Sequence, residues 1–271
     1  MQYQIYPCKA DHNAEYLVFS SGLGGHGVFW QPQIEYFTAQ FHVLTYDQAG
    51  CHAAAPVLDR DYSIQDMALQ LFSILQEIGL EKFHFVGHAL GGFIGAELAR
   101  LIRYSEMHIL SLTIINGWKR LDSHTLKCFE ARIALLKHSG ERAYIEAQAL
   151  FLYPPAWISQ HIEDLKVMEN KQAADFPPKQ NVLMRLKALM HYDMSAETEM
   201  ILRKIPIHLI ANKDDFLVPY HQSEQLKQQF EHAELSLMER GGHASTVTET
   251  TAINNQILNF IRHFTALSIA S

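Results

Sequence analysis

Short apolar runs alternate with longer amphipathic stretches along most of the chain. Runs of apolar, β-branched and aromatic residues bounded by polar or turn residues predict β-strands. Six such runs are Tyr16–Ser20, Phe41–Tyr46, Phe83–Gly87, His108–Ile115, Ile207–Ala211 and Leu235–Met238, with residues 1–7 as a candidate edge strand. Strands that alternate with helical stretches are typical of βα units, so the pattern predicts an α/β fold with a mostly parallel sheet flanked by helices.

The clearest predicted helix begins at Ser63, because Ser63 and Asp66 have the spacing of a capping pair. Apolar side chains then recur with a helical period, and Gly79 is a suitable C-terminal cap. The apolar positions are Ile64, Met67, Ala68, Leu71, Phe72 and Leu75. A last helix is predicted from about Thr250 to Phe264. Its sheet-facing positions are Ile253, Ile257, Phe260, Ile261 and Phe264.

Strand patterns no longer alternate with helical ones between Trp118 and Glu197. Almost every stretch there has a helical pattern, interrupted by two Pro-Pro pairs. This segment is too long for a single crossover between two strands. The simplest interpretation is a helical lid, residues 118–197, inserted after the sixth strand of an α/β core. Residues 1–117 and 198–271 are then the two parts of that core.

Composition and charge narrow the functional classes. The chain has 271 residues, 48% of them apolar and 19% charged, with a net charge of −7. No cluster of Lys and Arg lines a predicted face, which argues against nucleic acid and an anionic membrane as partners. There is neither a signal-peptide pattern nor an apolar run long enough to span a bilayer. We therefore expect a cytoplasmic monomer or homodimer acting on a small molecule.

Cysteine and histidine usage gives no indication of a disulfide or a metal. The three cysteines, Cys8, Cys51 and Cys128, are odd in number and widely spaced, which fits a reducing compartment. Sixteen histidines are present, but none has the helical His-x-x-x-His spacing of a metal site with a nearby carboxylate. The sequence thus predicts no metal and no cofactor.

The stretch Gly87-His88-Ala89-Leu90-Gly91 joins a predicted strand to a predicted helix. A strand, a Gly-x-Ser-x-Gly turn and a helix form the nucleophile elbow of α/β-hydrolases. Here Ala89 occupies the place of the serine, and its methyl group cannot attack a substrate. The backbone N–H of Leu90, at the N-terminus of the helix, remains a donor for an oxyanion hole.

A second donor is expected in the loop after the first long strand. The sequence Ser20-Ser21-Gly22-Leu23-Gly24-Gly25-His26-Gly27 leaves its backbone N–H groups unobstructed. We assign the N–H of Leu23 to the oxyanion hole and Gly22 to the substrate pocket. A flexible turn is the alternative interpretation, and His26 is either exposed or in contact with substrate.

Two loops at the carboxyl ends of later strands supply an acid and a base. Asp215 lies four residues before Pro219, at the place where this fold carries the triad acid, and Asp214 is the surface alternative. His243 follows two glycines in the loop before the last helix. The chain order of elbow, acid and histidine is that of an α/β-hydrolase triad, so we expect Asp215 to orient His243 as a general base.

Other polar residues near the predicted strand ends have less specific roles. We expect Asp47 to brace its loop, His88 to be packed structure, and Cys51 to be an ordinary thiol. Trp118 is assigned to the wall of the pocket, together with the lid aromatics Phe151 and Tyr153, although core packing accounts for these three equally well.

Eight segments together resemble one group of α/β-hydrolases, the RutD-type hydrolases of bacterial uracil (pyrimidine) degradation. They are SGLGG, YDQ, DYSI, GHALG, INGW, EAQALFLYP, DDFLVP and GGHA. The alanine of the elbow belongs to that group's pattern. The resemblance implies hydrolysis of a labile C–N substrate, aminoacrylate or carbamate, both of which decay unaided in water. The chain departs from the pattern at Ala49-Gly50-Cys51, where Arg and then Gly-Thr are expected.

A labile substrate gives the missing nucleophile a physical explanation. A triad without its nucleophile retains ~10³–10⁴-fold catalysis over water from the oxyanion hole and binding. We therefore expect direct attack by a water that His243 deprotonates, with Ala89 leaving room for that water. Two other interpretations stay open, a non-catalytic ligand-binding relative of the hydrolases and a cofactor-free oxygenase or lyase on the same fold.

Overall fold

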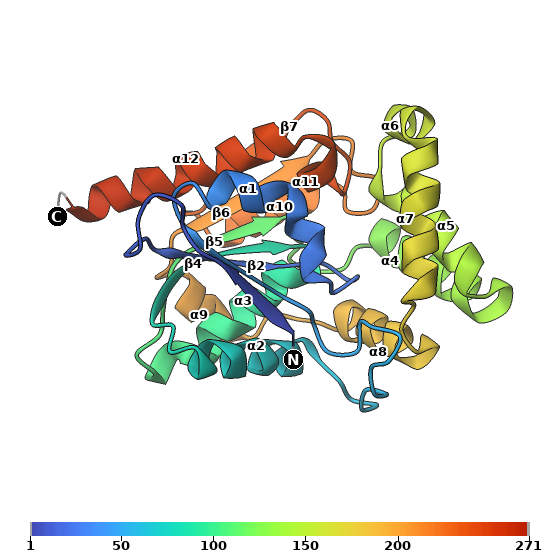
Figure 1. The fold of residues 1–271 in the computed structure, drawn as a ribbon, viewed down its shortest axis with the longest axis horizontal. Helices are drawn as coiled ribbons and strands as arrows, with labels where there is room; N and C mark the ends of the chain where they lie inside the picture. The colour runs from blue at the N-terminus through green and yellow to red at the C-terminus, as the bar shows by residue number, and fades with distance from the viewer. Residues whose placement is uncertain (1, 270–271) are drawn as a thin grey trace.

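The computed structural model describes the backbone of residues 2–269 and contains a seven-stranded sheet (Figure 1). The order across the sheet is β1-β3-β2-β4-β5-β6-β7, and every strand is parallel to its neighbours except the edge strand β1. The strands are β1 (Tyr3–Tyr6), β2 (Tyr16–Ser20), β3 (His42–Tyr46), β4 (Lys82–His88), β5 (His108–Ile115), β6 (Ile207–Asn212) and β7 (Glu234–Met238). The strand order reverses around β2, so the carboxyl ends of β2 and β4 meet at the topological switch point where ligands bind in open α/β sheets.

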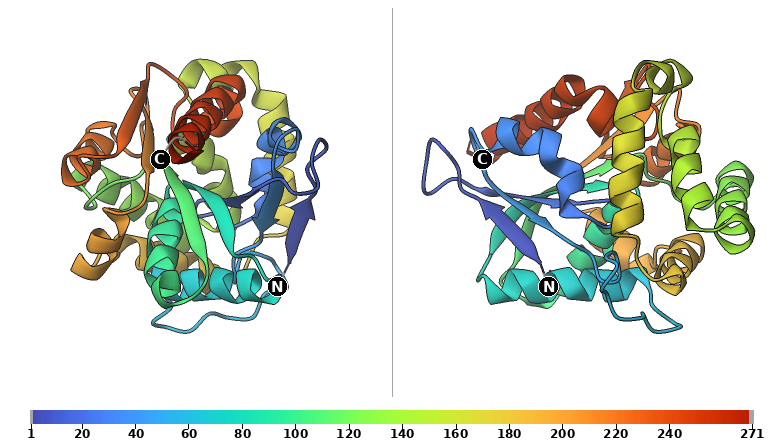
Figure 2. Two further views of the ribbon diagram at one scale, coloured as in Figure 1. Left: turned by 90° about the vertical axis from the view of Figure 1, so that its left-hand side faces the viewer. Right: turned by 45° about the vertical axis from the view of Figure 1, so that its right-hand side comes forward.

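Helices cover both faces of this sheet, as the left-hand view of Figure 2 shows. One face packs against α1 (Gln31–Phe37) and α12 (Thr250–Ile269), with the short elements η1 (Gly27–Trp30) and α11 (Ser245–Thr248) at their ends. The other face packs against α2 (Ile64–Glu77), α3 (Leu90–Leu101), α9 (Ala196–Leu202) and α10 (His221–Gln229). A 3-10 turn, η2 (Ile102–Tyr104), extends α3. Each face therefore has its own apolar core, which is why the inner parallel strands are buried along most of their length.

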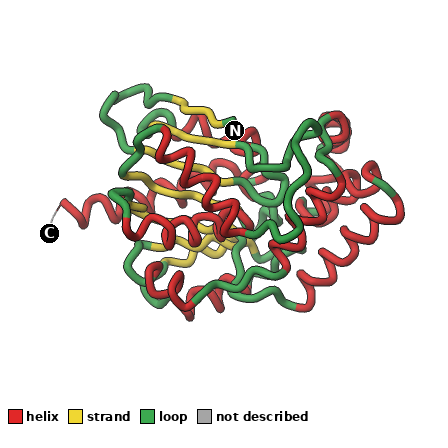
Figure 3. The backbone as a smooth tube through the Cα atoms, turned by 90° about the horizontal axis from the view of Figure 1, so that it is seen from below, coloured by secondary structure: helices red, strands yellow, loops and turns green. Residues whose placement is uncertain are grey.

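The remaining helices lie together beyond the carboxyl ends of the strands (Figures 1 and 3). They are α4 (Ser123–Ala134), the π-helical turn η3 (Leu135–Ser139), α5 (Glu141–Leu152), α6 (Pro155–Gln160), α7 (Ile162–Ala174) and α8 (Lys179–Met190). We propose that residues 118–197 act as a lid on a core made of residues 1–117 and 198–271. At the boundary between them, α9 packs on α3 and so contributes to the core layer.

The structure confirms the predicted strands and helices, with differences of one or two residues at several ends. The last helix, α12, continues to Ile269, five residues beyond its predicted end at Phe264. Ser63 and Asp66 form a reciprocal capping box at the start of α2, and Gly79 beyond its end has a φ of 67°. The lid follows the fifth strand along the chain, so its predicted place after the sixth is wrong. The predicted edge strand within residues 1–7 is observed as β1. No described helix combines the length and apolar character that a bilayer-spanning helix requires.

Candidate active site

The elbow at the end of β4 retains its strained backbone although its nucleophile is absent. Ala89 has φ 46° and ψ −111°, a conformation that costs a non-glycine residue about 1–3 kcal/mol. The N–H of Ala89 donates to the carbonyl of Ile115 at 2.8 Å, which ties the turn to the neighbouring strand. A Cβ on Gly87 would lie 2.3 Å from the carbonyl carbon of Gly91. The glycines therefore permit the tight turn that an exposed nucleophile would need.

The loop after β2 lies directly against this elbow. Ser20 pairs with Gly87 in the sheet, and a Cβ on Gly91 would lie 2.1 Å from the carbonyl oxygen of Ser20. Neither the N–H of Leu23 nor that of Leu90 donates a hydrogen bond in the described turns and side-chain contacts. Both predicted oxyanion donors are thus available on adjoining segments.

A buried arginine of the lid braces the loop that carries Leu23. Arg185 on α8 donates from Nη2 to the carbonyl of Leu23 at 3.0 Å and from Nη1 to the carbonyl of Ala49 at 3.1 Å. It also donates to the side chain of Gln48, whose Nε2 donates in turn to the carbonyl of Ser21 at 2.7 Å. The lid, the loop after β2 and the loop after β3 therefore meet at the guanidinium group of Arg185.

The predicted acid and base are in contact. A 2.8 Å hydrogen bond joins Nδ1 of His243 to Oδ2 of Asp215, and both side chains are buried. The other oxygen of Asp215 accepts from the N–H groups of Leu217 and Val218 at 2.8 and 2.9 Å. Because a carboxylate only accepts, Nδ1 carries the proton and Nε2 keeps the lone pair that a general base needs.

The backbone of the histidine loop is held by three polar side chains. Asp214 accepts from the N–H groups of Gly241 and Gly242 at 3.1 and 2.8 Å, so it braces the loop that carries His243. The carbonyl of His243 accepts from Nδ2 of Asn116 at 2.7 Å and from Nε2 of His88 at 2.8 Å. His88 is therefore structural, as predicted, and acts by positioning the base.

Burial and the nearby charge of His243 lower the pKa of His88 to about 3. An unfolded histidine titrates near 6.5, so between these two pH values the unfolded chain binds more protons than the folded one. The free energy of unfolding should consequently fall as the pH drops below 6.5, by about 2 kcal/mol per such group between pH 7 and pH 5.

Glutamine at position 88 can still donate to the carbonyl of His243 but does not titrate. We expect wild type to lose about 2 kcal/mol more stability than His88→Gln between pH 7 and pH 5, measured by urea unfolding. Burial also lowers the pKa of His208, to about 4, but that contribution is common to both proteins. Equal losses in the two proteins would show that His88 is not the group responsible.

Sequence reasoning missed Asn116, Gln48 and Arg185. Asn116 has φ 54°, and it shares with Ala89 a positive φ that no other described non-glycine residue has. Its place directly after β5, at the carboxyl edge of the sheet, was the available signal. For Arg185 the sequence offered none, because it lies 137 residues from Gln48.

The structure places Trp118 in the core and two lid aromatics beside the histidine loop. Trp118 is buried in the core, with its ring 4.8 Å from Phe93 and 6.3 Å from Phe129. Phe151 and Tyr153 flank Leu152, whose carbonyl accepts from the N–H of Ala244 at 2.9 Å, so this lid segment contacts the histidine loop.

In the β2 and β3 loops, Asp47 accepts from the N–H of Gly27 at 2.7 Å, which confirms its bracing role. Burial raises the pKa of the Cys51 thiol to about 12, in line with an unreactive cysteine. His26, partly buried in the loop after β2, has a lowered pKa, chiefly through burial and then through the charge of His52.

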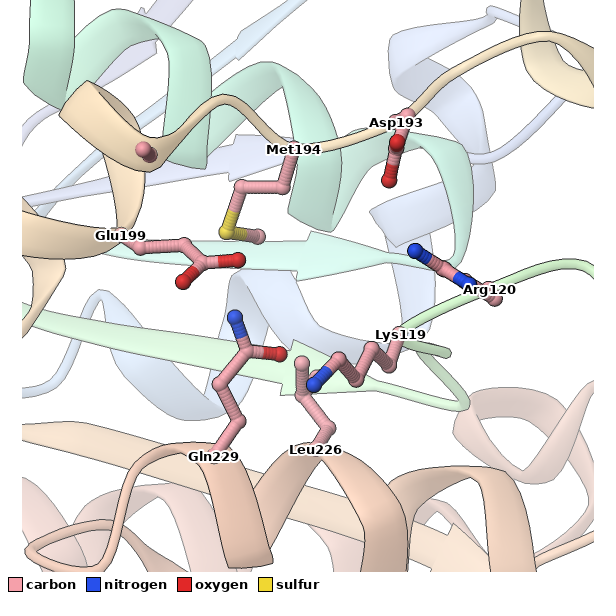
Figure 4. Close-up of a pocket in the computed structure, with 8 residues that line it drawn as sticks. Lys119, Arg120, Asp193, Met194, Glu199, Leu226 and Gln229 are labelled. Carbon is pink, nitrogen blue, oxygen red and sulfur yellow. The ribbon is translucent and has the colours of Figure 1, made fainter.

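A surface pocket of about 290 Å³ lies elsewhere, between the start of the lid, α9 and α10 (Figure 4). Its lining residues are Lys119, Arg120, Asp193, Met194, Ala196, Glu199, Leu226 and Gln229. None of the elbow, acid or histidine residues lines it. It lacks an oriented acid–base pair, so we do not assign the chemistry to it.

The fold, the elbow and the ordered acid–histidine pair define an α/β-hydrolase. The chain belongs to the family described as alpha/beta hydrolase fold, which it matches over residues 16–250. Within that family it groups with the RutD proteins. It is 53% identical, over 97% of its length and 98% of the relative, to "Putative carbamate hydrolase RutD" of Acinetobacter baylyi.

Further comparisons agree with this placement. The RutD protein of Stutzerimonas stutzeri, which carries the same name, is 40% identical over 96% of each chain. Among solved structures, the enol-lactonase from Burkholderia xenovorans LB400 superposes with a TM-score of 0.82 at 21% identity, covering 96% of each chain. The structural likeness supports the fold alone, whereas the sequence relatives place the chain in the RutD group.

Proposed function

We propose that this protein hydrolyses a small, labile C–N substrate, carbamate or aminoacrylate, in pyrimidine (uracil) degradation. One observation carries the proposal: the elbow keeps a strained, catalytically shaped backbone at Ala89 while His243 keeps its buried hydrogen bond to Asp215. A pure binding pocket would need neither feature. The names of the RutD relatives support carbamate as the substrate class.

In the proposed reaction, water is the nucleophile. Nε2 of His243 takes a proton from a water held above Ala89, and the water oxygen forms a bond to the carbon that carries the substrate nitrogen. The N–H groups of Leu23 and Leu90 stabilise negative charge that develops in the tetrahedral intermediate. The C–N bond then breaks, His243 returns the proton to nitrogen, and ammonia leaves.

The magnitude of catalysis expected from such a site fits an unstable substrate. An oxyanion hole and substrate binding without a nucleophile give ~10³–10⁴-fold acceleration, which is about 4–5.5 kcal/mol of barrier lowering. That amount is negligible for a stable ester or amide. For a molecule that already hydrolyses in water, it suffices to sustain a pathway.

A buried arginine of the lid supports an anionic substrate. Arg132 on α4 donates to the hydroxyl of Tyr144 at 3.3 Å and lies over the rings of Phe129 and Phe151. Among the described residues, Arg132 has no carboxylate within ion-pair distance, and its Nε has no hydrogen-bond acceptor. A buried cation is costly without a counter-charge. Both candidate substrates are anions and would supply that charge.

Replacing Arg132 by methionine should therefore weaken substrate binding. A hydrogen bond to a charged group contributes about 1.5–3 kcal/mol, so we expect KM to rise about 10–100-fold with a smaller change in kcat. Arg142→Met is the matched control, because Arg142 is exposed on α5 and pairs with Glu146. An unchanged KM in Arg132→Met would remove this residue from the substrate site.

The function itself is tested by timing ammonia release from carbamate and from aminoacrylate against buffer alone, with a stable ester in parallel. We expect one labile substrate to be accelerated and the ester to remain intact. Tight binding without acceleration would instead indicate a ligand-binding protein. Oxygen consumption during breakdown of an organic acid would indicate an oxygenase.

A further inference from the structure

The loop after β2, residues 21–26, carries the proposed donor Leu23 and is called the oxyanion loop. Four potential metal ligands come together where this loop meets the loop after β3. Their ligand atoms all lie within 4.8 Å of one another. The four residues, called the loop cluster below, are His26, Asp47, Cys51 and His52. Cys51 is buried and the other three are partly buried.

We propose that the loop cluster is a binding site for one Zn²⁺ ion. Two imidazoles, a thiolate and a carboxylate are donors that tetrahedral zinc accepts, and mixed sulfur and nitrogen ligation favours zinc over magnesium or calcium. Four protein ligands make the site a closed, structural one rather than a catalytic one. The proposal is independent of the hydrolase mechanism.

The distances between ligand atoms are close to those of a zinc site. Tetrahedral zinc, with bonds of about 2.0–2.3 Å, places its ligand atoms about 3.3–3.8 Å apart. Sγ of Cys51 lies 3.9 Å from Nδ1 of His26, and Nε2 of His52 lies 3.1 Å from Oδ2 of Asp47. The side chains would have to shift by about an ångström to close around the ion.

A second carboxylate orients one of the ligands. Oδ2 of Asp175, at the C-terminal end of α7, accepts from Nδ1 of His52 at 2.8 Å, and its Oδ1 accepts from the N–H of Ala53 at 2.9 Å. This leaves Nε2 of His52 directed at the loop cluster. A carboxylate that holds the far nitrogen of a histidine is the usual outer partner of a zinc ligand.

The same contacts would allow a metal-free function, a brace in which His52 links Asp47 to Asp175. That brace uses neither Cys51 nor His26, whereas a zinc ion uses both. On binding, the Cys51 thiol gives its proton to solvent and coordinates as thiolate. Cys51 lies in the Ala49-Gly50-Cys51 stretch, where the chain departs from the pattern of the group it resembles. Position 51 therefore separates the two interpretations.

A bound ion would connect three segments. His26 follows the proposed oxyanion donor Leu23 by three residues. Asp47 and His52 lie in the loop after β3, and Asp175, which holds His52, belongs to the lid. We therefore expect zinc to fix the oxyanion loop and to raise the melting temperature of the protein.

The test is a titration of full-length, chelator-treated protein with Co²⁺ as a spectroscopic probe, followed by displacement with Zn²⁺. We expect one equivalent to bind with a thiolate-to-cobalt charge-transfer band and a tetrahedral ligand-field spectrum. Cys51→Ser should abolish the band, whereas Cys8→Ser, which alters another buried cysteine, should keep it. Asp175→Asn should weaken binding about 10–100-fold, and Asp164→Asn, an exposed change on the same helix, should not.

Absence of the band in wild type, or its persistence in Cys51→Ser, would overturn the proposal. If Cys51→Ser does not fold, the partly exposed His26 provides the second variant. His26→Gln should weaken Co²⁺ binding at least tenfold and leave the His52 brace intact, and unchanged binding in that variant would equally contradict a zinc site.

Discussion

Asparagine in place of Asp215 is expected to lower the rate of substrate breakdown about 10²–10⁴-fold while the protein stays folded. The amide oxygen can still accept from the N–H groups of Leu217 and Val218. The amide nitrogen, however, donates, so it would face Nδ1 of His243 and require that atom to be unprotonated. The imidazole proton then moves to Nε2, and the atom that should take a proton from water no longer has a free lone pair.

The neighbouring Asp214 gives a matched control. It carries the same carboxylate and braces the same loop through Gly241 and Gly242, but it makes no contact with the imidazole. Asp214→Asn should cost about 1 kcal/mol of stability and change the rate by less than about tenfold. Equal rate losses in the two variants would mean that Asp215 acts through loop structure rather than through the tautomer of His243.

Alanine at position 91 should destabilise the protein by about 2–3 kcal/mol or prevent folding, although alanine is the better helix former by about 1 kcal/mol. Its Cβ would lie 2.1 Å from the carbonyl oxygen of Ser20 and 2.7 Å from that of Ser21. Both are backbone atoms, at the end of β2 and the start of the loop that follows it, so no side-chain rotation can relieve the contact. The loop would have to move away from the N-terminus of α3.

Gly24→Ala is the control for this change, since it adds the same methyl group to the loop that Gly91 contacts. A Cβ on Gly24 would meet no atom within 4 Å. Its free energy of unfolding should therefore stay within about 0.5 kcal/mol of wild type in a urea titration. A Gly91→Ala protein as stable as Gly24→Ala would show that the close approach of loop and helix is not required.

Much of the fold could be predicted because its signals are local. The strands follow from apolar runs, and α2 follows from the Ser63–Asp66 pair and Gly79. The elbow, Asp215 and His243 were predictable because each lies in a loop after a strand, and the carboxyl ends of parallel strands share one edge of the sheet.

What escaped prediction depends on how the lid packs on the core. Arg185, from α8, meets the β2 and β3 loops across the interior, and His52 meets Asp175 only because α7 ends beside it. The loop cluster joins residues from two loops, so no helical spacing of histidines could reveal it.

The central claim is that this elbow without a nucleophile still supports catalysis through His243. Its most direct test is the rate of ammonia release by wild type and by His243→Ala at equal protein concentration, each corrected for the buffer-only rate. Wild type should accelerate release ~10³–10⁴-fold, and the variant should lose about 10²-fold or more of that acceleration. Equal rates for the two proteins would contradict the account.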